Sequence, residues 1–109
     1  MRKVRFRPLA WKDIQESAEY LANEGSGKIA ERFLDAIDDL THRLTGLPQM
    51  GAPCRFNNPL LRDVRRLPVT GFRKWMVFYQ ASNDDIEVIR VLHGARDIAS
   101  ILNRDAWRL

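Results

Sequence analysis

One stretch decides the fold: FRKWMVFYQA at residues 72–81, followed by the turn Asn83-Asp84-Asp85 and by IEVIRVL at residues 86–92. Its two outer parts are rich in aromatic and β-branched residues, which favour extended strands. The Asn and Asp residues between them are typical of a tight turn. Strands joined by so short a turn pair antiparallel. The stretch therefore predicts a β-hairpin.

The residues around this hairpin extend the predicted sheet. Residues 61–68 predict a further strand, and its short connection to residue 72 makes it antiparallel to the hairpin. Near the start of the chain, Lys3 to Arg7 alternates polar and apolar side chains, as a short strand with one buried face does. Residues 49–59 are rich in Gly, Pro and Asn and predict a loop.

Two helices are predicted between the first strand and this loop. Pro8 suits the first turn of a helix, and apolar residues then recur at helical spacing until residues 23–27 interrupt them. Ser26 can cap the second helix, which Gly46 and Pro48 end. Two helices with so short a join form an antiparallel hairpin.

The second helix carries the clearest apolar stripe of the chain. Its members are Ala30, Phe33, Leu34, Ile37, Leu40 and Leu44. Such a stripe packs on a core, so we expect Phe33, Leu34, Ile37 and Leu40 to be buried against Val77 and Ile89 or their strand neighbours.

The end of the chain predicts a short helix or helical turn from Asp97 to Leu102, with Asp97 as its cap. Residues 103–109 are either an idle tail or part of a binding surface. The order is thus β-α-α-β-β-β with a C-terminal helical piece, which predicts one α+β domain over residues 1–109. In this two-layer domain the helical hairpin packs on one face of an antiparallel sheet, and the other face can receive a partner.

Composition excludes several classes of protein. Of 109 residues, 45% are hydrophobic and 29% charged, as in ordinary globular domains. No apolar run approaches the roughly 18–20 residues of a membrane span, and the basic start of the chain does not resemble a secretory signal. With Cys54 as the single cysteine and two histidines, we expect no internal disulfide, no metal site, no cofactor and a cytoplasmic location.

Charge is distributed unevenly along the chain. Residues 9–46 carry four basic and eight acidic residues, whereas residues 47–79 carry six basic residues and one acidic residue. Of the 18 basic residues, 14 are arginine, which suits bidentate contacts with carboxylates or phosphates. A basic middle segment predicts an anionic partner, either nucleic acid or an acidic polypeptide.

The ordered set of motifs resembles the ParE branch of the RelE/ParE toxin superfamily. The resemblance rests on IRVLHGARDI at residues 89–98, on LPQMG at 47–51, on LRDVR at 61–65, on FRKWMVFY at 72–79 and on Asp13-Ile14 in the first helix. It implies the toxin of a type II toxin–antitoxin system, neutralised by a cognate ParD-like antitoxin. It also implies that the toxin inhibits DNA gyrase by trapping the complex with cleaved DNA, and that it reaches DNA otherwise only through the antitoxin.

Two alternatives remain open from the sequence. One is a ribosome-dependent mRNA interferase, and metal-free RNA cleavage needs cations around the phosphate and groups that move protons. For that chemistry the candidates are Arg73, Arg90 and His93, although Arg90 is equally explained by pairing with a carboxylate and His93 by a structural hydrogen bond. The other is a non-toxic protein that binds the antitoxin as a co-repressor. We expect no catalytic residues.

Two sets of residues are the candidates for binding. Charge and resemblance together predict an antitoxin-binding set of Arg62, Arg65, Arg66 and Arg73. For the target, we expect a C-terminal set of Arg96, Arg104, Trp107 and Arg108, because Arg and Trp are enriched at binding hot spots. Cys54 lies beside Arg55 in the loop, which predicts at most a mildly lowered thiol pKa and no role as a nucleophile.

Overall fold

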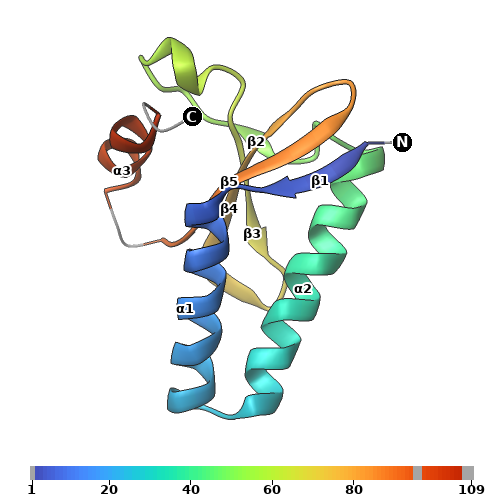
Figure 1. Ribbon diagram of the computed structural model, residues 1–109, viewed down its shortest axis with the longest axis vertical. Helices are drawn as coiled ribbons and strands as arrows, with labels where there is room; N and C mark the ends of the chain where they lie inside the picture. The colour runs from blue at the N-terminus through green and yellow to red at the C-terminus, as the bar shows by residue number, and fades with distance from the viewer. Residues whose placement is uncertain (1, 95–96, 107–109) are drawn as a thin grey trace.

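A computed structural model describes residues 2–94 and 97–106 as a sheet covered on one face by a pair of long helices (Figure 1). The helices are α1 (Pro8–Glu24), α2 (Gly27–Gly46) and α3 (Ile98–Asp105), with a 3-10 turn η1 (Pro59–Leu61). The strands are β1 (Lys3–Phe6), β2 (Ala52–Pro53), β3 (Arg65–Val69), β4 (Phe72–Ala81) and β5 (Asp85–His93). The predicted α+β class is therefore confirmed, and the predicted elements occur in the expected order. The short strand β2 and the turn η1 were not predicted, and β2 lies within residues 49–59, where a loop was expected.

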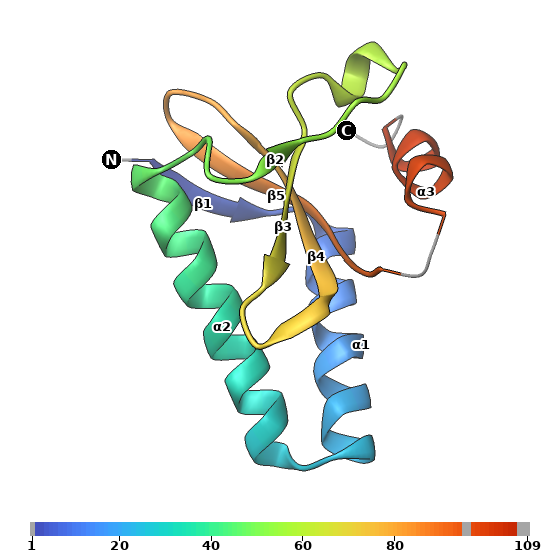
Figure 2. The same ribbon diagram turned by 180° about the vertical axis from the view of Figure 1, so that it is seen from behind.

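The five strands form one sheet in the order β1-β5-β4-β3-β2. The pairs β3–β4 and β4–β5 are antiparallel, as predicted, and β2 also pairs antiparallel with β3. In contrast, β1 pairs with β5 in parallel, with Lys3 opposite Asp85 and Phe6 opposite Val88. The sheet is therefore mixed and not wholly antiparallel. The reason lies in the helical hairpin, which carries the chain from β1 to the opposite edge of the sheet, so that the later strands return step by step to β1 (Figure 2).

Local sequence signals set the helix ends. Pro8 is the first residue of α1, and the Ser26 side chain accepts a hydrogen bond from the Ile29 N–H at the start of α2. The Asp97 carboxylate accepts one from the Ser100 N–H in the same way at the start of α3. These groups satisfy N–H donors that have no partner inside the helix. None of the described helices is long and apolar enough to cross a membrane.

The main core lies between the helical hairpin and the sheet. Its buried members are Ala10, Ile14, Phe33, Ile37, Leu40, Val69, Trp75, Val77, Val88 and Val91. The expectation that Leu34 belongs to this core is wrong, because its side chain is 43% exposed. One face of α2 is already formed by Phe33, Ile37, Leu40 and Leu44. Successive residues of a helix are rotated by about 100°, so Leu34 points away from the sheet.

A second core occupies the other face of the sheet. It consists of Leu61, Val64, Phe78, Ile89, Leu92, Leu102 and Ala106. Ile89 thus lies on the face opposite to the one predicted. The turn η1 and helix α3 lie side by side over this core in Figures 1 and 2, so part of the second face is covered by the chain itself.

A β-bulge interrupts the regular pairing of β5 with β4. Tyr79 pairs with Val88, whereas the next pair is Phe78 with Arg90, so Ile89 is an extra residue on β5. Val88 and Val91 then face the helical hairpin, while Ile89 faces the second core. Alternation counted back from Val91 would place Ile89 against the helical hairpin, and the bulge places it on the second face instead.

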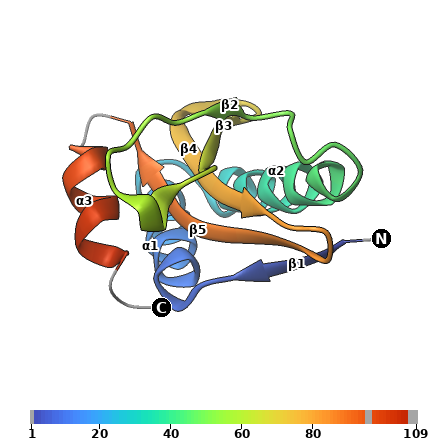
Figure 3. The same cartoon turned by 90° about the horizontal axis from the view of Figure 1, so that it is seen from above.

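Two elements differ in length from their predictions. The strand expected at residues 61–68 begins only at Arg65, because η1 occupies residues 59–61 and Asp63 adopts a left-handed backbone with a φ of 63°. Helix α3 continues to Asp105, three residues beyond Leu102, and its end lies beside the sheet in the view from above (Figure 3). Residues 103–106 are therefore not a frayed tail, because the helix continues through them to Asp105 and Ala106 is buried in the second core.

Candidate functional site

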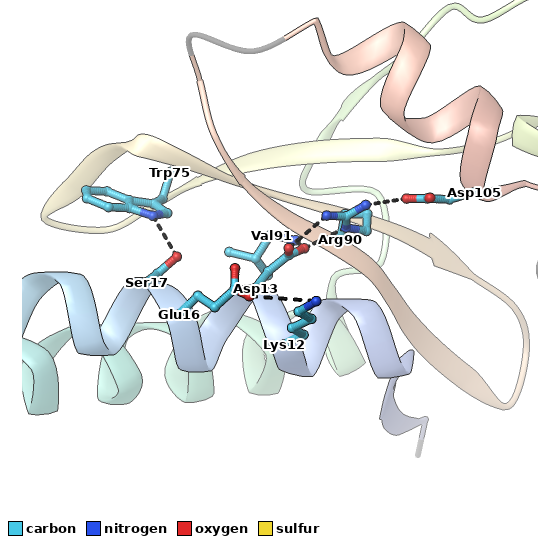
Figure 4. A network of polar contacts seen from close by, with 8 residues as sticks. All are labelled: Lys12, Asp13, Glu16, Ser17, Trp75, Arg90, Val91 and Asp105. Atoms are coloured by element: carbon cyan, nitrogen blue, oxygen red, sulfur yellow. Dashed lines mark hydrogen bonds and ion pairs between the residues drawn. The ribbon is translucent and has the colours of Figure 1, made fainter.

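An ion network joins three elements of the fold at the bulge of β5. Asp13 of α1 accepts two hydrogen bonds from the Arg90 guanidinium, at 2.7 Å from Nε and 2.8 Å from Nη2 (Figure 4). It also accepts one from the Val91 N–H at 3.0 Å. On its other side, Arg90 donates through Nη1 to Asp105 at the end of α3. We call these three charged residues the Arg90 network.

The Arg90 network is largely shielded from water, since each of its three side chains is only 11% exposed. The pKa of the Arg90 guanidinium is raised mainly by its hydrogen bonds to Asp13. Asp105 also raises this pKa, whereas burial lowers it. The guanidinium is therefore charged at every physiological pH and fully engaged by two carboxylates. The interpretation that Arg90 pairs with a carboxylate to fix its strand is confirmed.

The three candidate nuclease residues do not gather around one point. Arg90 pairs with Phe78, and Arg73 is exposed five residues earlier on β4, which is about 17 Å along an extended strand. His93 pairs with Trp75 near Arg73, and its ring meets the Trp75 ring edge-to-face with centroids 4.8 Å apart. The exposed His93 thus packs on an aromatic ring, and within residues 2–94 and 97–106 its side chain makes no hydrogen bond.

The predicted antitoxin-binding arginines divide into two groups. Arg65 is half-buried and donates to the carbonyls of Gln49 and Gly51, so it holds the loop that follows α2. Arg62 and Arg66 are exposed beside it, and Arg73 is exposed at the start of β4. Because neighbouring side chains on a strand point to opposite faces, Arg65 and Arg66 do not share one surface. Arg62, Arg66 and Arg73 are therefore the exposed members of the predicted set, whereas Arg65 is engaged in holding the loop.

Of the predicted target-binding set, the structure places Arg104 alone. Arg104 is exposed in the last turn of α3, where a positive charge complements the helix dipole. Arg96, Trp107 and Arg108 lie outside the described residues. Helix α3 is held by Leu102 and Ala106 in the second core and by Asp105 in the Arg90 network. Its outer side, with Asn103 and Arg104, is presented on a fixed support.

Cys54 and the metal-binding residue types offer no reactive centre in the described chain. Burial raises the pKa of the Cys54 thiol, and Arg66 opposes this only in part. The expected mild lowering by a neighbouring arginine is therefore wrong in direction, because the loop packs the thiol against the second core. Among the described residues, no three His, Cys, Asp or Glu side chains gather as metal ligands would.

Sequence reasoning missed a hollow of about 360 Å³ between α1, β4 and β5. It is lined by Asp13, Glu16, Ser17, Tyr20, Trp75, Val91, Leu92 and His93. The Trp75 Nε1–H donates to the Ser17 hydroxyl at 3.0 Å, as Figure 4 shows, and the Tyr20 ring lies 6.4 Å from the Trp75 ring. The spacing of Glu16 and Tyr20, one helical turn apart, was the available signal.

Comparison with known proteins adds three findings. The family described as the ParE toxin of the parDE type II toxin–antitoxin system matches residues 4–98. The chain is 26% identical over 103 residues to "Toxin ParE3" of Caulobacter vibrioides, covering 94% of this chain and 96% of that protein. Its fold is similar, at a TM-score of 0.68 and 15% identity, to a chain of the chromosomal ParDE system from P. aeruginosa, covering 85% of this chain and 96% of that one.

Proposed function

Since this chain belongs to the ParE family of type II toxins, we propose that it acts by binding DNA gyrase and trapping its complex with cleaved DNA, without a chemical step of its own. The observation that supports this most is the Arg90 network. Arg90, one of the two candidate cations for a phosphate in a nuclease, is already held by Asp13 and Asp105. Arg73 and His93 lie apart from it along the sheet.

A toxin that acts by binding needs a surface that prefers one state of its target. Such a protein shifts the target toward the cleaved state by the difference in affinity between the two states. A surface on a rigid support makes this difference large, because little conformational freedom is lost on binding. Helix α3 fits that requirement, and we assign its outer side, with Arg104, to the gyrase contact. Action on gyrase places the toxin in the cytoplasm.

Neutralisation by a ParD-like antitoxin is the second half of the proposal. Arg62, Arg66 and Arg73 are exposed cations on the sheet side of the molecule. Carboxylates of an antitoxin segment that orders on binding can pair with them and fix its register, while apolar side chains supply affinity. The antitoxin is the part that contacts operator DNA.

The decisive experiment expresses the toxin without its antitoxin and examines two kinds of damage. We expect an SOS response and DNA breaks covalently linked to gyrase, both in cells and with purified gyrase. Ribosome-dependent cleavage of mRNA without gyrase-linked breaks would overturn the proposal in favour of the interferase. Absence of growth arrest, with the antitoxin still bound, would favour the co-repressor.

Single substitutions separate the two mechanisms further. On the proposed mechanism, Arg73→Ala and His93→Ala leave the toxin active, whereas Arg104→Glu weakens trapping of gyrase. Arg32→Glu, on the exposed side of α2, is the matched control for Arg104→Glu. In a nuclease, loss of one preorganised cation lowers the rate about 10²- to 10³-fold. Loss of toxicity in folded Arg73→Ala and His93→Ala, with Arg104→Glu still toxic, contradicts the proposed mechanism.

A further inference from the structure

We propose that the hollow between α1, β4 and β5 binds the guanidinium group of an arginine presented by the antitoxin. One side of the hollow is formed by helix α1, from which Asp13 and Glu16 line it. Helix α1 carries four acidic residues and one basic residue over Pro8–Glu24. A positively charged group is therefore the complement of this surface.

One carboxylate of the hollow is available for a new partner. Asp13 is engaged by Arg90 and by the Val91 N–H, so it has no need of a further cation. Glu16 contacts only Lys12 among the described residues, at 3.9 Å, and the two side chains are 63% and 69% exposed. An exposed pair one helical turn apart is weak. A guanidinium in the hollow can replace Lys12 with a planar, bidentate contact.

Aromatic rings provide the remaining walls. Tyr20 is 55% exposed, and its ring lies 6.4 Å from that of Trp75 at an angle of 50°. The Trp75 ring is fixed by the hydrogen bond to Ser17 and by edge-to-face contact with His93. Guanidinium groups are attracted to the faces of such rings and stack on them. Carboxylate and aromatic wall together favour arginine over lysine.

The choice of the antitoxin as the source of this arginine rests on the proposed function. An antitoxin segment that reaches both the basic residues and this hollow carries charges of both signs. The hollow then fixes its register, because the opposite alignment places a carboxylate against Glu16. Like charges in contact are an effective way to exclude wrong alignments.

The site is tested first on the free toxin. Acetyl-arginine amide is titrated while the indole N–H signal of Trp75 is followed by NMR, with acetyl-citrulline amide as the neutral control of the same shape. We expect the arginine probe to move this signal in a saturable way and the citrulline probe to leave it unchanged. Glu16→Gln and Tyr20→Leu should each weaken the arginine probe about threefold or more. Glu31→Gln changes an exposed carboxylate on α2 and should leave the affinity for the arginine probe unchanged.

An equal response to citrulline, or equal affinity in Glu16→Gln and wild type, overturns the site. The antitoxin is tested next, by measuring how fast it dissociates from complexes that contain the same toxin variants. We expect dissociation about threefold faster or more in Glu16→Gln and no change in Glu31→Gln. Unchanged dissociation, with the arginine probe still binding, overturns the antitoxin as occupant. The gyrase assay on free toxin is independent of either result.

Discussion

The hydroxyl group of Tyr79 accepts a hydrogen bond from the backbone N–H of Gly51 at 2.9 Å. The same hydroxyl donates to the Pro48 carbonyl at 2.8 Å, so the loop after α2 closes around a buried ring of β4. This contact gives a physical reason for the Pro-x-x-Gly sequence in that loop. A Cβ atom on residue 51 would lie 2.7 Å from the Tyr79 hydroxyl oxygen and 2.9 Å from the Arg66 carbonyl oxygen.

Gly51→Ala should therefore destabilise the protein by about 1–3 kcal/mol, because the added methyl group has to displace a fixed backbone or a fixed ring. Urea unfolding followed by circular dichroism measures the loss. Gly46→Ala is the matched control, since a Cβ there meets nothing within 4 Å. Equal stability of Gly51→Ala and wild type would show that the loop does not close on Tyr79.

The two leucines Leu34 and Leu40 of α2 should respond very differently to truncation. Leu40 is 3% exposed and Leu34 is 43% exposed. Leu40→Ala leaves a cavity in the main core and should cost about 2–5 kcal/mol of unfolding free energy. Leu34→Ala should change it by about 0.5 kcal/mol or less, as surface substitutions do. A larger loss of unfolding free energy for Leu34→Ala than for Leu40→Ala would show that α2 is rotated about its axis and packs a different face on the sheet.

Removing the cation of the Arg90 network should be costly. Arg90→Met keeps much of the volume but leaves Asp13 and Asp105 shielded from water without their partner, which should destabilise the fold by about 3–5 kcal/mol. Arg5→Met is the control, because Arg5 pairs with Asp85 and Glu87 while 59% exposed. It should cost about 1 kcal/mol or less. Equal losses in the two variants, measured by urea unfolding, would contradict the structural role of Arg90.

Charge reversal on the basic surface should weaken the antitoxin complex. In the double variant Arg62→Glu and Arg66→Glu, we expect lower affinity and a smaller dependence of affinity on salt, since pairs with antitoxin carboxylates are lost. Calorimetry at two salt concentrations measures both quantities. Arg32→Glu with Arg43→Glu reverses two exposed charges on α2 and serves as the control. An unchanged salt dependence in the first variant counts against this surface.

Sequence patterns predicted the features that depend on neighbouring residues. Pro8, Ser26 and Asp97 act within one turn of their own helices, so their roles could be inferred without knowledge of the fold. The hairpin of β4 and β5 follows from a short turn in the same way.

Features that depend on distant residues were beyond such patterns. Asp13 and Arg90 are 77 positions apart, and the residues around each of them do not indicate that the two form a pair. The parallel pairing of β1 with β5 depends on where β5, the last strand, lies in the sheet. The hollow beside Glu16 exists only because Trp75 and His93 come from strands that lie against α1. Such sites are visible only once the chain is folded.

The extra residue Ile89 in β5 has a consequence for the lengths of chain that this fold tolerates. Side chains alternate along a strand, so removing Ile89 would make Tyr79–Val88 and Phe78–Arg90 consecutive pairs of a regular ladder. Ile86, Val88, Val91 and Leu92 would then keep their present faces. The second core would lose the buried Ile89 side chain, while Arg90 would keep its place opposite Phe78. A deletion at another position of β5 would reverse the facing of the residues on one side of it, so this strand tolerates a change of length only at the bulge.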